Sequence, residues 1–381
     1  MKKVLFVATV VKTHINEFHL PYLKLFKDNG WETAVAARND FEDPADCVIP
    51  YCDRYFDLPF ARSPRSADNR RAYKALKTLI DMGEYDIIHC HTPMGAALTR
   101  LAARQARKRG TKVYYTAHGF HFYKGAPLMN WLVYYPVEKW LARYTDVLIT
   151  INQEDYARAR AFHAGKVCYV PGIGIDLTRF QPTRGGRAAK RAELDLGAED
   201  FVLLSVGELI PRKNHEVVLR ALALLKQRGG LKGLRYVICG RGACEEKLKH
   251  LAQELGIADA VSFLGYRNDV RAICGCSDLF LFMSRQEGLP VALMEAMACG
   301  LPAVCSDIRG NIDLIEDGIS GAVIRSTPEA VADIVCRLRS DSARRTRLAA
   351  AAIERVKRFD LAAVMPQMAE LYGLPAMRTQ N

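Results

Sequence analysis

The sequence predicts an α/β protein of two doubly wound domains, each with a parallel sheet covered by helices on both faces. Short apolar runs alternate with longer amphipathic stretches, this pattern occurs twice, and a Pro/Gly-rich stretch at 171–186 separates the two occurrences. With 381 residues, 50% of them hydrophobic, each half is long enough to bury its own core. We place the domains at 1–175 and 176–381, with a C-terminal helix that packs back on the first domain.

The candidate strands are almost continuously apolar, as expected for strands buried on both faces of a sheet. In the first half they are 4–10, 33–37, 87–90, 113–116, 147–151 and 168–170. Helix-like stretches lie between them at 18–27, 70–82 and 95–108. In the second half the strands are 201–206, 235–239, 261–264, 279–283, 303–305 and 322–324, and the tail at 343–371 is predicted to be one helix. Two such domains facing each other form a cleft at the carboxyl ends of their strands, where ligands bind.

Composition excludes several classes of protein. The net charge of +12 suits an anionic partner, such as a phosphorylated substrate or an anionic membrane, but a nucleic-acid motif is missing from the sequence. The 11 cysteines are odd in number and include no CxxC, which indicates reduced thiols in a cytoplasmic protein. The pairs Cys274/Cys276 and His89/His91 lack a second pair at zinc spacing, so we expect no metal and no cofactor. The apolar stretch at 128–137 is about half the length of a membrane-spanning helix.

The most informative stretch, 284–302, follows a buried strand. Glu287 stands at the exit of that strand, Gly288 permits a sharp turn, and Pro290 suits the first turn of a helix. Gly300 ends the helix. The free backbone amides at the start of this helix offer an anion site. Glu295, on the second turn, and Glu287 are carboxylates suited to accepting hydroxyl groups of a sugar or ribose.

A second stretch, 205–214, supplies cations at the end of another strand. The strand ends at Gly207, and a loop carries Arg212 and Lys213 to a helix for which Asn214 is a fair N-cap. Adjacent Arg and Lys side chains neutralise a leaving diphosphate without a metal ion. A solvated Arg–Lys pair is the alternative interpretation of these two residues alone.

Taken together, these motifs resemble the retaining GT-B glycosyltransferases of family 4, most closely the branch that builds exopolysaccharide, capsule or lipid-linked oligosaccharide. The resemblance covers nearly the whole chain. It rests on the spacing of Glu287 and Glu295 within Glu-Gly-Leu-Pro and Glu-Ala-Met-Ala-x-Gly-x-Pro, on the Gly-Glu-Leu…Arg-Lys-Asn run, and on the loop at 306–318. The family usually has Glu where Asp313 stands, which leaves the role of that residue open. Loops at 9–14 and 116–120 resemble the acceptor-side loops of this branch.

The resemblance implies a role for each matching residue. The diphosphate would be bound by Arg212 and Lys213, with Gly207 and Glu208 in the same substrate-binding run. The donor sugar would be held by Glu287 and by the backbone of Gly288, Leu289, Pro290 and Val291, and the ribose by Glu295. The base would lie beside Gly265, Tyr266, Arg267 and Asn268. His118 would touch the transferred sugar, whereas its position after an apolar run, taken alone, favours a buried, hydrogen-bonded core histidine.

The first half is the predicted acceptor side. His14 and Asn16 follow the first strand and are candidates for the acceptor pocket, with an ordinary surface loop as the alternative. Basic residues at 62–77 and aromatic residues at 120–140 suit an anionic bilayer and a polyprenyl-diphosphate acceptor. A solvated helix face and a buried packing patch are the alternatives. We therefore expect a cytoplasmic protein, peripheral on the inner face of the plasma membrane.

The predicted reaction transfers a sugar, with retention, from a nucleotide diphosphate sugar, by family habit a UDP-linked hexose or N-acetylhexosamine, to a glycan or lipid-linked acceptor. No carboxylate is clearly placed as a nucleophile, which favours front-face displacement. The rival interpretations are a nucleotide-sugar 2-epimerase of the same fold and a non-catalytic nucleotide-sugar binder. A dinucleotide oxidoreductase is excluded because Val11-Lys12-Thr13, not GxGxxG, follows the first strand.

Overall fold

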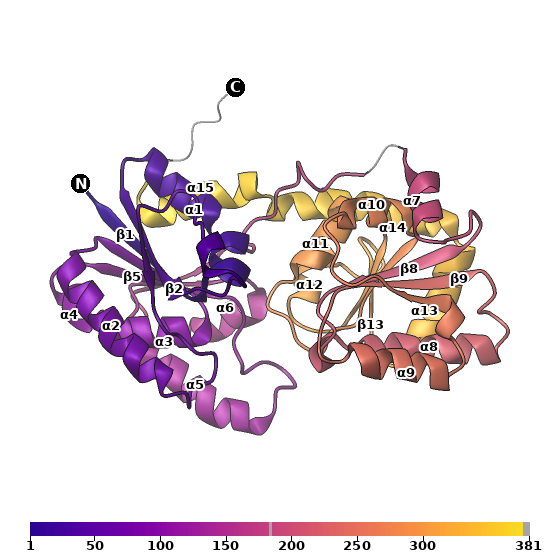
Figure 1. Cartoon of the computed structure of the whole chain (residues 1–381), viewed down its shortest axis with the longest axis horizontal. Helices are drawn as coiled ribbons and strands as arrows, with labels where there is room; N and C mark the ends of the chain where they lie inside the picture. Colours follow the sequence, from indigo (N-terminus) through magenta and orange to yellow (C-terminus); the bar gives the residue numbers. More distant parts are fainter. Residues whose placement is uncertain (183–184, 376–381) are drawn as a thin grey trace. The chain divides into compact units, whose positions relative to one another are not determined.

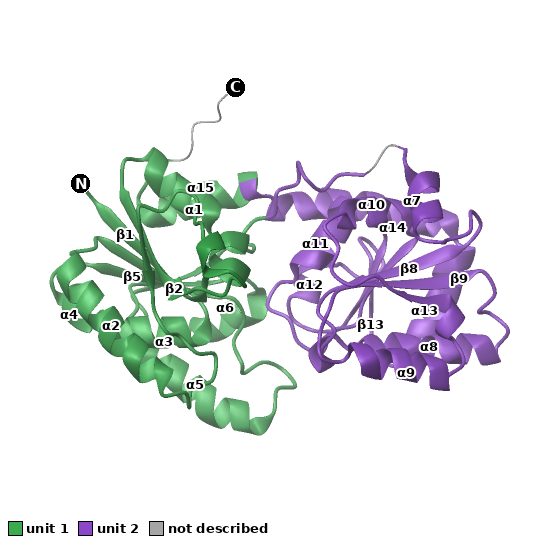
Figure 2. Cartoon of the chain, in the orientation of Figure 1, with its two compact units in different colours: residues 1–174, 362–381 green, residues 175–361 purple. Residues whose placement is uncertain are grey.

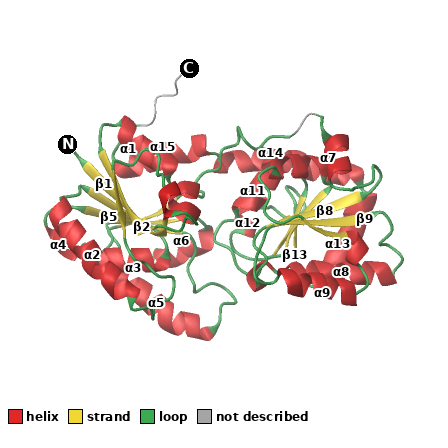
Figure 3. Ribbon diagram, in the orientation of Figure 1, coloured by secondary structure: helices red, strands yellow, loops and turns green. Residues whose placement is uncertain are grey.

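A computed structural model describes residues 1–182 and 185–375 of the chain. The chain forms two compact units: unit 1 comprises Met1–Gly174 and returns at Ala362, and unit 2 comprises Ile175–Leu361 (Figures 1 and 2). Each unit holds one parallel sheet with helices on both of its sides (Figure 3). The predicted pair of doubly wound α/β domains is thereby confirmed. Residues 183–184 of the predicted linker, and 376–381 of the predicted second domain, lie outside the described residues.

The sheet of unit 1 has the strand order β3-β2-β1-β4-β5-β6-β7. Its strands are β1 (Lys3–Val10), β2 (Glu32–Arg38), β3 (Arg54–Asp57), β4 (Ile87–Cys90), β5 (Lys112–Ala117), β6 (Val147–Thr150) and β7 (Lys166–Tyr169). Its helices are α1 (Leu20–Asp28), α2 (Asp68–Gly83), α3 (Pro93–Ala102), α4 (Arg104–Lys108), α5 (Leu128–Ala142), α6 (Gln153–Ala159) and α15 (Leu361–Tyr372). One π-helical turn, η1 (Val11–Asn16), continues directly from the end of β1.

The sheet of unit 2 has the strand order β10-β9-β8-β11-β12-β13. Its strands are β8 (Phe201–Val206), β9 (Leu234–Cys239), β10 (Val261–Phe263), β11 (Leu279–Phe282), β12 (Ala303–Ser306) and β13 (Ala322–Ile324). Its helices are α7 (Arg187–Glu193), α8 (His215–Gln227), α9 (Glu245–Glu254), α10 (Val270–Cys276), α11 (Val291–Ala298), α12 (Asn311–Leu314), α13 (Pro328–Ser340) and α14 (Ser342–Val356).

The order of strands puts the loops that carry chemistry next to one another. In unit 1, β1 pairs with β4 and β4 with β5, so residues that follow these three strands share one edge of the sheet. In unit 2, β8 pairs with both β9 and β11, which brings the ends of these strands together. The inner strands of both sheets are buried along nearly their whole length, as in β1, where Val4 to Ala8 are fully inaccessible. Apolar burial on both faces explains why these runs form strands.

The stretch at 95–108, predicted as one helix, forms α3 and α4, and the structure differs from the sequence prediction at β3 and in the tail as well. The edge strand β3 was not predicted, because its sequence Arg-Tyr-Phe-Asp has charged ends and only two half-buried side chains. The tail, predicted as one helix, forms α14 and α15, separated by a 3₁₀ turn at Lys357–Phe359 and by extended Asp360. Of these two helices, α14 lies in unit 2 and α15 packs in unit 1, where Tyr372 touches Phe26. None of the described helices combines the length and apolarity needed to cross a bilayer.

Candidate functional site

Three charged side chains meet at the carboxyl edge of the unit 2 sheet. Lys213 Nζ lies 2.8 Å from Glu287 Oε1, and Arg212 Nη1 lies 3.3 Å from Glu287 Oε2. Lys213 and Arg212 come from the turn η3 (Pro211–Lys213) after β8, and Glu287 comes from the loop after β11. Glu287 is only 7% exposed, so its carboxylate is withdrawn from water and compensated by two cations. Lys213 is largely buried, whereas the Arg212 side chain is 40% exposed and accessible to an anion.

Backbone contacts fix the two loops that hold these charges. Arg212 accepts a hydrogen bond at its carbonyl from the Arg285 amide, at 2.8 Å, and its guanidinium donates to the Gln286 carbonyl at 3.1 Å. Asn214 was predicted to be an N-cap, but its left-handed backbone makes no side-chain cap. The side-chain amide of Asn214 instead donates, through Nδ2, to the Met283 carbonyl and to the Ser326 hydroxyl. Asn214 therefore ties the cationic turn to the end of β11.

The loop around Glu287 is also held from the side of β12. Arg309 Nε donates to the Glu287 carbonyl at 3.1 Å. Gly310 packs against Gly288 so closely that a Cβ at Gly310 would lie 2.5 Å from the Gly288 oxygen. The Asp313 carboxylate accepts a hydrogen bond from the Gly310 amide at 3.0 Å. Asp313, whose role was open from the sequence, thus supports this close approach locally.

Three glycines bring the neighbouring strand ends into contact. The Gly207 amide donates to the Cys239 carbonyl, and the Gly240 amide donates to the Gly265 carbonyl at 2.8 Å. A Cβ at Gly240 would lie 1.9 Å from the Gly207 oxygen, so only glycine fits there. Glu208, next in the chain, is exposed. The turns after β8, β9 and β10 are therefore joined into one backbone surface beside the cations.

The residues predicted beside a base lie after β10. Tyr266 is 68% exposed and Asn268 is exposed. The Arg267 guanidinium lies 2.6 Å from Asp269 and 2.8 Å from Glu193, and its hydrogen bond to Asp269 holds the pKa of that carboxyl well below its usual range. Arg267 is thus already engaged, and Tyr266 offers the exposed ring of this group.

Helix α11 carries the second glutamate of the motif. The helix begins at Val291, with Pro290 in extended conformation just before it and not inside the first turn as predicted. Leu289 and Pro290 are buried, while Gly288 and Val291 are half-buried. Glu295, on the second turn, is also half-buried. The two glutamates therefore stand on one continuous segment, Glu287 in the loop and Glu295 on the helix.

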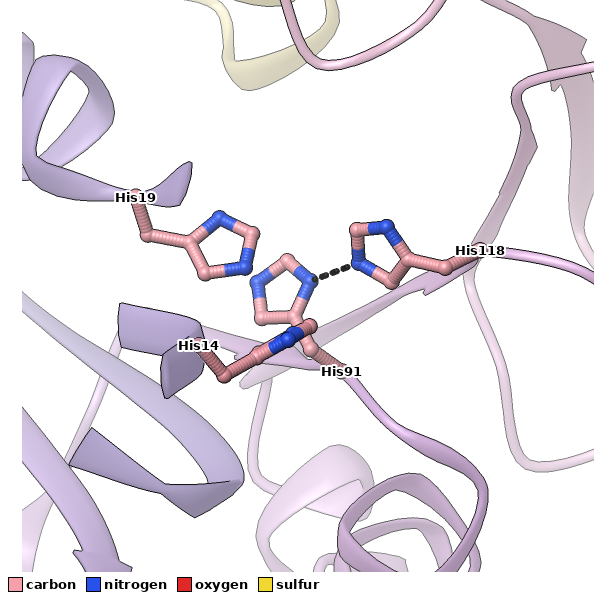
Figure 4. Close-up of side chains that lie close together, drawn as sticks. All are labelled: His14, His19, His91 and His118. Atoms are coloured by element: carbon pink, nitrogen blue, oxygen red, sulfur yellow. Dashed lines mark hydrogen bonds between the residues drawn. The ribbon is translucent and has the colours of Figure 1, made fainter. Parts of the chain in front are cut away.

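In unit 1, the structure brings His14 and His118 together but not Asn16. The rings of His14 and His118 lie 5.0 Å apart, and burial lowers the pKa of His118 to about 4. The Asn16 amide instead donates to the Val48 carbonyl at 2.9 Å. Two further histidines, His19 and His91, complete the group (Figure 4). No motif in the sequence singles out His19, and His91 was considered only as part of the His89/His91 pair, which lacks zinc spacing.

Comparison with known proteins assigns the family. Residues 186–355 match the family described as "Glycosyl transferases group 1", and residues 23–179 match "Glycosyltransferase Family 4". The chain is 42% identical over 385 residues to a Bacillus subtilis (strain 168) protein named as a glycosyltransferase, EpsD, covering 98% of this chain and 96% of that protein. The chain is a family 4 glycosyltransferase. A second relative of this glycosyltransferase is the Escherichia coli UDP-Gal:alpha-D-GlcNAc-diphosphoundecaprenol alpha-1,3-galactosyltransferase, 32% identical over 272 residues, with 68% of this chain and 69% of that protein covered.

Solved structures confirm the GT-B fold of the glycosyltransferase. Sucrose-phosphate synthase from Thermosynechococcus elongatus matches with a TM-score of 0.80 at 21% identity, covering 98% of both chains. HepE from Anabaena, solved in complex with UDP and glucose, matches with a TM-score of 0.79 at 20% identity, covering 98% of this chain and 100% of that one.

Proposed function

We propose that this glycosyltransferase transfers a sugar, with retention of configuration, from a nucleotide diphosphate sugar to a lipid-linked or glycan acceptor in the synthesis of a surface polysaccharide. The observation that carries the proposal is the contact of Lys213 and Arg212 with Glu287 at the edge of the unit 2 sheet. The cations suit a leaving diphosphate, and the carboxylate suits the hydroxyls of the sugar attached to it. One relative is named for a UDP-Gal donor and a diphosphoundecaprenol acceptor, which favours UDP and a polyprenyl-linked acceptor.

In the proposed reaction, Lys213 and Arg212 act on the diphosphate and Glu287 acts on the sugar. Lys213 is largely buried and fixed by Glu287, so it would hold the diphosphate in one position while Arg212, more exposed, closes on it from solvent. As the bond to the sugar breaks, negative charge grows on the β-phosphate, and both cations stabilise it. The departing phosphate oxygen takes the proton of the acceptor hydroxyl, which attacks from the same face. Glu287 and the amides of the loop after it would orient the sugar.

In this proposal the nucleotide is bound by helix α11 and by the turn after β10. Glu295, half-buried on α11, accepts the ribose hydroxyls, and the exposed ring of Tyr266 stacks on the base. His118 donates a hydrogen bond to the transferred sugar, a role for which its neutral imidazole at physiological pH is suited. Charge stabilisation in this scheme comes from the two cations, so transfer is expected to persist in EDTA.

The proposal includes contact with an anionic membrane through unit 1. Helix α5 exposes an apolar series to solvent: Leu128 (72%), Met129 (64%), Leu132 (61%), Val133 (46%), Val137 (46%) and Trp140 (41%). Exposed basic residues Arg70, Arg71 and Lys74 lie on α2, and both α2 and α5 contact α3. Basic residues and exposed aliphatic and Trp side chains, on two helices that both contact α3, suit an anionic bilayer, where a lipid-linked acceptor would reside.

The experiment is a donor panel. Purified full-length protein is incubated with UDP-, GDP-, dTDP- and ADP-sugars and a polyprenyl-diphosphate sugar, with EDTA present, and the product is analysed for anomeric configuration by NMR. Transfer from one donor with retention supports the proposal. Inversion, or a donor converted to a new sugar nucleotide without acceptor, overturns it. A glycan without a lipid serves as the comparison acceptor for the polyprenyl-diphosphate sugar.

A further inference from the structure

Four histidines converge at the carboxyl edge of the unit 1 sheet. His14 lies in η1 after β1, His19 just before α1, His91 directly after β4, and His118 directly after β5. One ring nitrogen of each lies within 4.8 Å of the corresponding nitrogens of the other three (Figure 4). They come from three separate stretches of the sequence, with His14 and His19 on the same one, and the adjacency of β1, β4 and β5 brings these stretches together.

The nitrogens of this four-histidine cluster have few partners within the protein. His19 and His91 are 1% exposed, yet both nitrogens of His19 and Nε2 of His91 lack a hydrogen-bond partner, as does Nε2 of His14. Within the cluster, His118 Nε2 contacts His91 Nδ1 at 3.3 Å. Buried polar side chains are normally hydrogen-bonded, so this set of unpartnered donors and acceptors indicates a ligand.

The neighbouring His89 gives an internal contrast. It is as buried as His91, but its Nδ1 contacts the Tyr372 hydroxyl at 2.6 Å and its Nε2 contacts the Thr116 hydroxyl at 2.9 Å. His89 therefore has the partners expected of a structural core histidine. In the four-histidine cluster, beyond the ends of the same strands, four ring nitrogens lack such partners.

Imidazole nitrogens alone favour ions such as Zn²⁺, Co²⁺, Ni²⁺ and Cu²⁺ over Mg²⁺ or Ca²⁺. In a tetrahedral zinc site, bonds of about 2.0 Å place the ligand nitrogens about 3.3 Å from one another. His118 Nε2 and His91 Nδ1 already stand 3.3 Å apart. One ligand nitrogen of each of the four lies within 4.8 Å of the others, and ion binding would require side-chain rotations that shorten the longer of these distances. We propose that His14, His19, His91 and His118 bind one divalent transition cation through four imidazole nitrogens.

Occupancy of this site would alter the transfer reaction. If His118 holds a hydrogen bond to the transferred sugar, a cation that draws its imidazole into the cluster removes that bond. Zn²⁺ would then inhibit transfer reversibly. This consequence rests on the proposed function, whereas cation binding itself does not, and the two are measured separately.

Binding is tested on the full chain after treatment with EDTA and desalting. Zn²⁺ is titrated by calorimetry, and Co²⁺ by its visible ligand-field absorption, which is intense for a tetrahedral site. We expect one ion per chain with micromolar or tighter affinity. His19→Gln and His91→Gln should each weaken binding at least tenfold. His14 is half-buried, so His14→Gln should disturb the packing of the fold less than these two substitutions. His250→Gln, an exposed histidine of unit 2 paired with Glu254, should bind as the parent does.

Several results overturn the proposal: less than 0.2 ions per chain at tenfold excess, a Co²⁺ spectrum of weak octahedral type, or unchanged affinity in folded His14→Gln and His91→Gln variants. Loss of binding in His250→Gln would also overturn it, because the ion would then be held at the surface. Circular dichroism and the melting temperature establish that each variant is folded. Inactivity in the EDTA-containing donor panel, for a chain that binds one Zn²⁺ in calorimetry, would contradict only the proposed function.

Discussion

Lys213 Nζ lies 2.8 Å from the Oε1 atom of Glu287, and this contact joins the turn after β8 to the loop after β11. The pair is mostly buried, and the Lys213 ammonium also lies 4.9 Å from the centre of the Phe282 ring. A lysine fixed in this way loses little further conformational entropy when it binds an anion. We therefore expect this contact to contribute both to folding stability and to sugar transfer. Substitutions of Lys213 and Arg212 measure the two contributions.

Lys213→Ala should lower the turnover of sugar transfer more than tenfold, equivalent to more than about 1.4 kcal/mol. It should also lower the free energy of unfolding by about 1–3 kcal/mol, because Glu287 stays buried with one charged partner removed. Arg212→Ala should lower turnover by a similar factor with less effect on stability, since Arg212 is 40% exposed. Turnover at saturating donor and urea unfolding measure the two effects.

Arg220→Ala is the matched control for these substitutions. Arg220 is 49% exposed on α8 and pairs with Glu216, without contact to Glu287. Its removal should leave turnover unchanged. If Lys213→Ala and Arg212→Ala each retain more than a tenth of the parent's turnover, the assignment of the two cations to the diphosphate is wrong.

The contact between Gly310 and Gly288 gives a second prediction. Gly310 has φ +80°, and a Cβ there would lie 2.5 Å from the Gly288 oxygen. Gly310→Ala should therefore displace the loop behind Glu287, raise KM for the donor at least fivefold and lower the unfolding free energy by about 2–4 kcal/mol. Donor kinetics and urea unfolding are the measurements.

Gly318→Ala separates backbone strain from the steric contact. Gly318 has a similar φ of +73°, and a Cβ added there would meet nothing within 4 Å. This variant should lose only about 1 kcal/mol, with unchanged KM, because it has the left-handed backbone without the clash. Equal effects of the two substitutions would show that the Gly310–Gly288 approach does not position the donor loop.

Most of the fold was predictable because buried parallel strands are continuous apolar runs, as in Phe201–Val206, which the sequence predicts to the residue. The strand β3 was missed because its edge position removes that signal. At the site, Glu287, Arg212 and Lys213 were chosen from local motifs, and their mutual contact follows from strand order. His19 gave no local signal, since its nearness to His91 and His118 depends on how β1, β4 and β5 pair.

The buried His215 leads us to expect that the folding stability of unit 2 falls at acid pH. Burial lowers the pKa of His215 to about 4, so this histidine is neutral in the folded chain, whereas in the unfolded chain it titrates near 6.5. Between these two values the unfolded state binds more protons, so stability falls as pH falls from about 6.5 to 4. The contribution of one such group is at most about 1.4 kcal/mol per pH unit.

The measurement is urea unfolding at pH 7.5, 6.0 and 5.0 for the parent and for His215→Asn. The variant should be less stable at pH 7.5, because it loses the contact of the ring with the Tyr236 hydroxyl. Its stability should nevertheless fall less steeply below pH 6.5. Parallel pH profiles for the two proteins would mean that His215 is not the source of the acid sensitivity.

The exposed apolar face of α5 gives the last prediction. Met129 and Leu132 are 64% and 61% exposed, and inserting both into a lipid interface is worth about 2 kcal/mol, a factor of roughly thirty. A double substitution, Met129→Gln with Leu132→Gln, should therefore weaken binding to vesicles containing anionic phosphatidylglycerol at least tenfold. Neither side chain is in the core, so the melting temperature should hardly change.

Ile319→Gln is the control, because Ile319 is 55% exposed but lies in unit 2. Binding should also weaken as salt rises, since the basic residues of α2 contribute through a screened attraction. Cosedimentation of the parent at the same level with neutral and anionic vesicles, or of the double variant at the parent's level, would exclude α5 as the membrane-binding face.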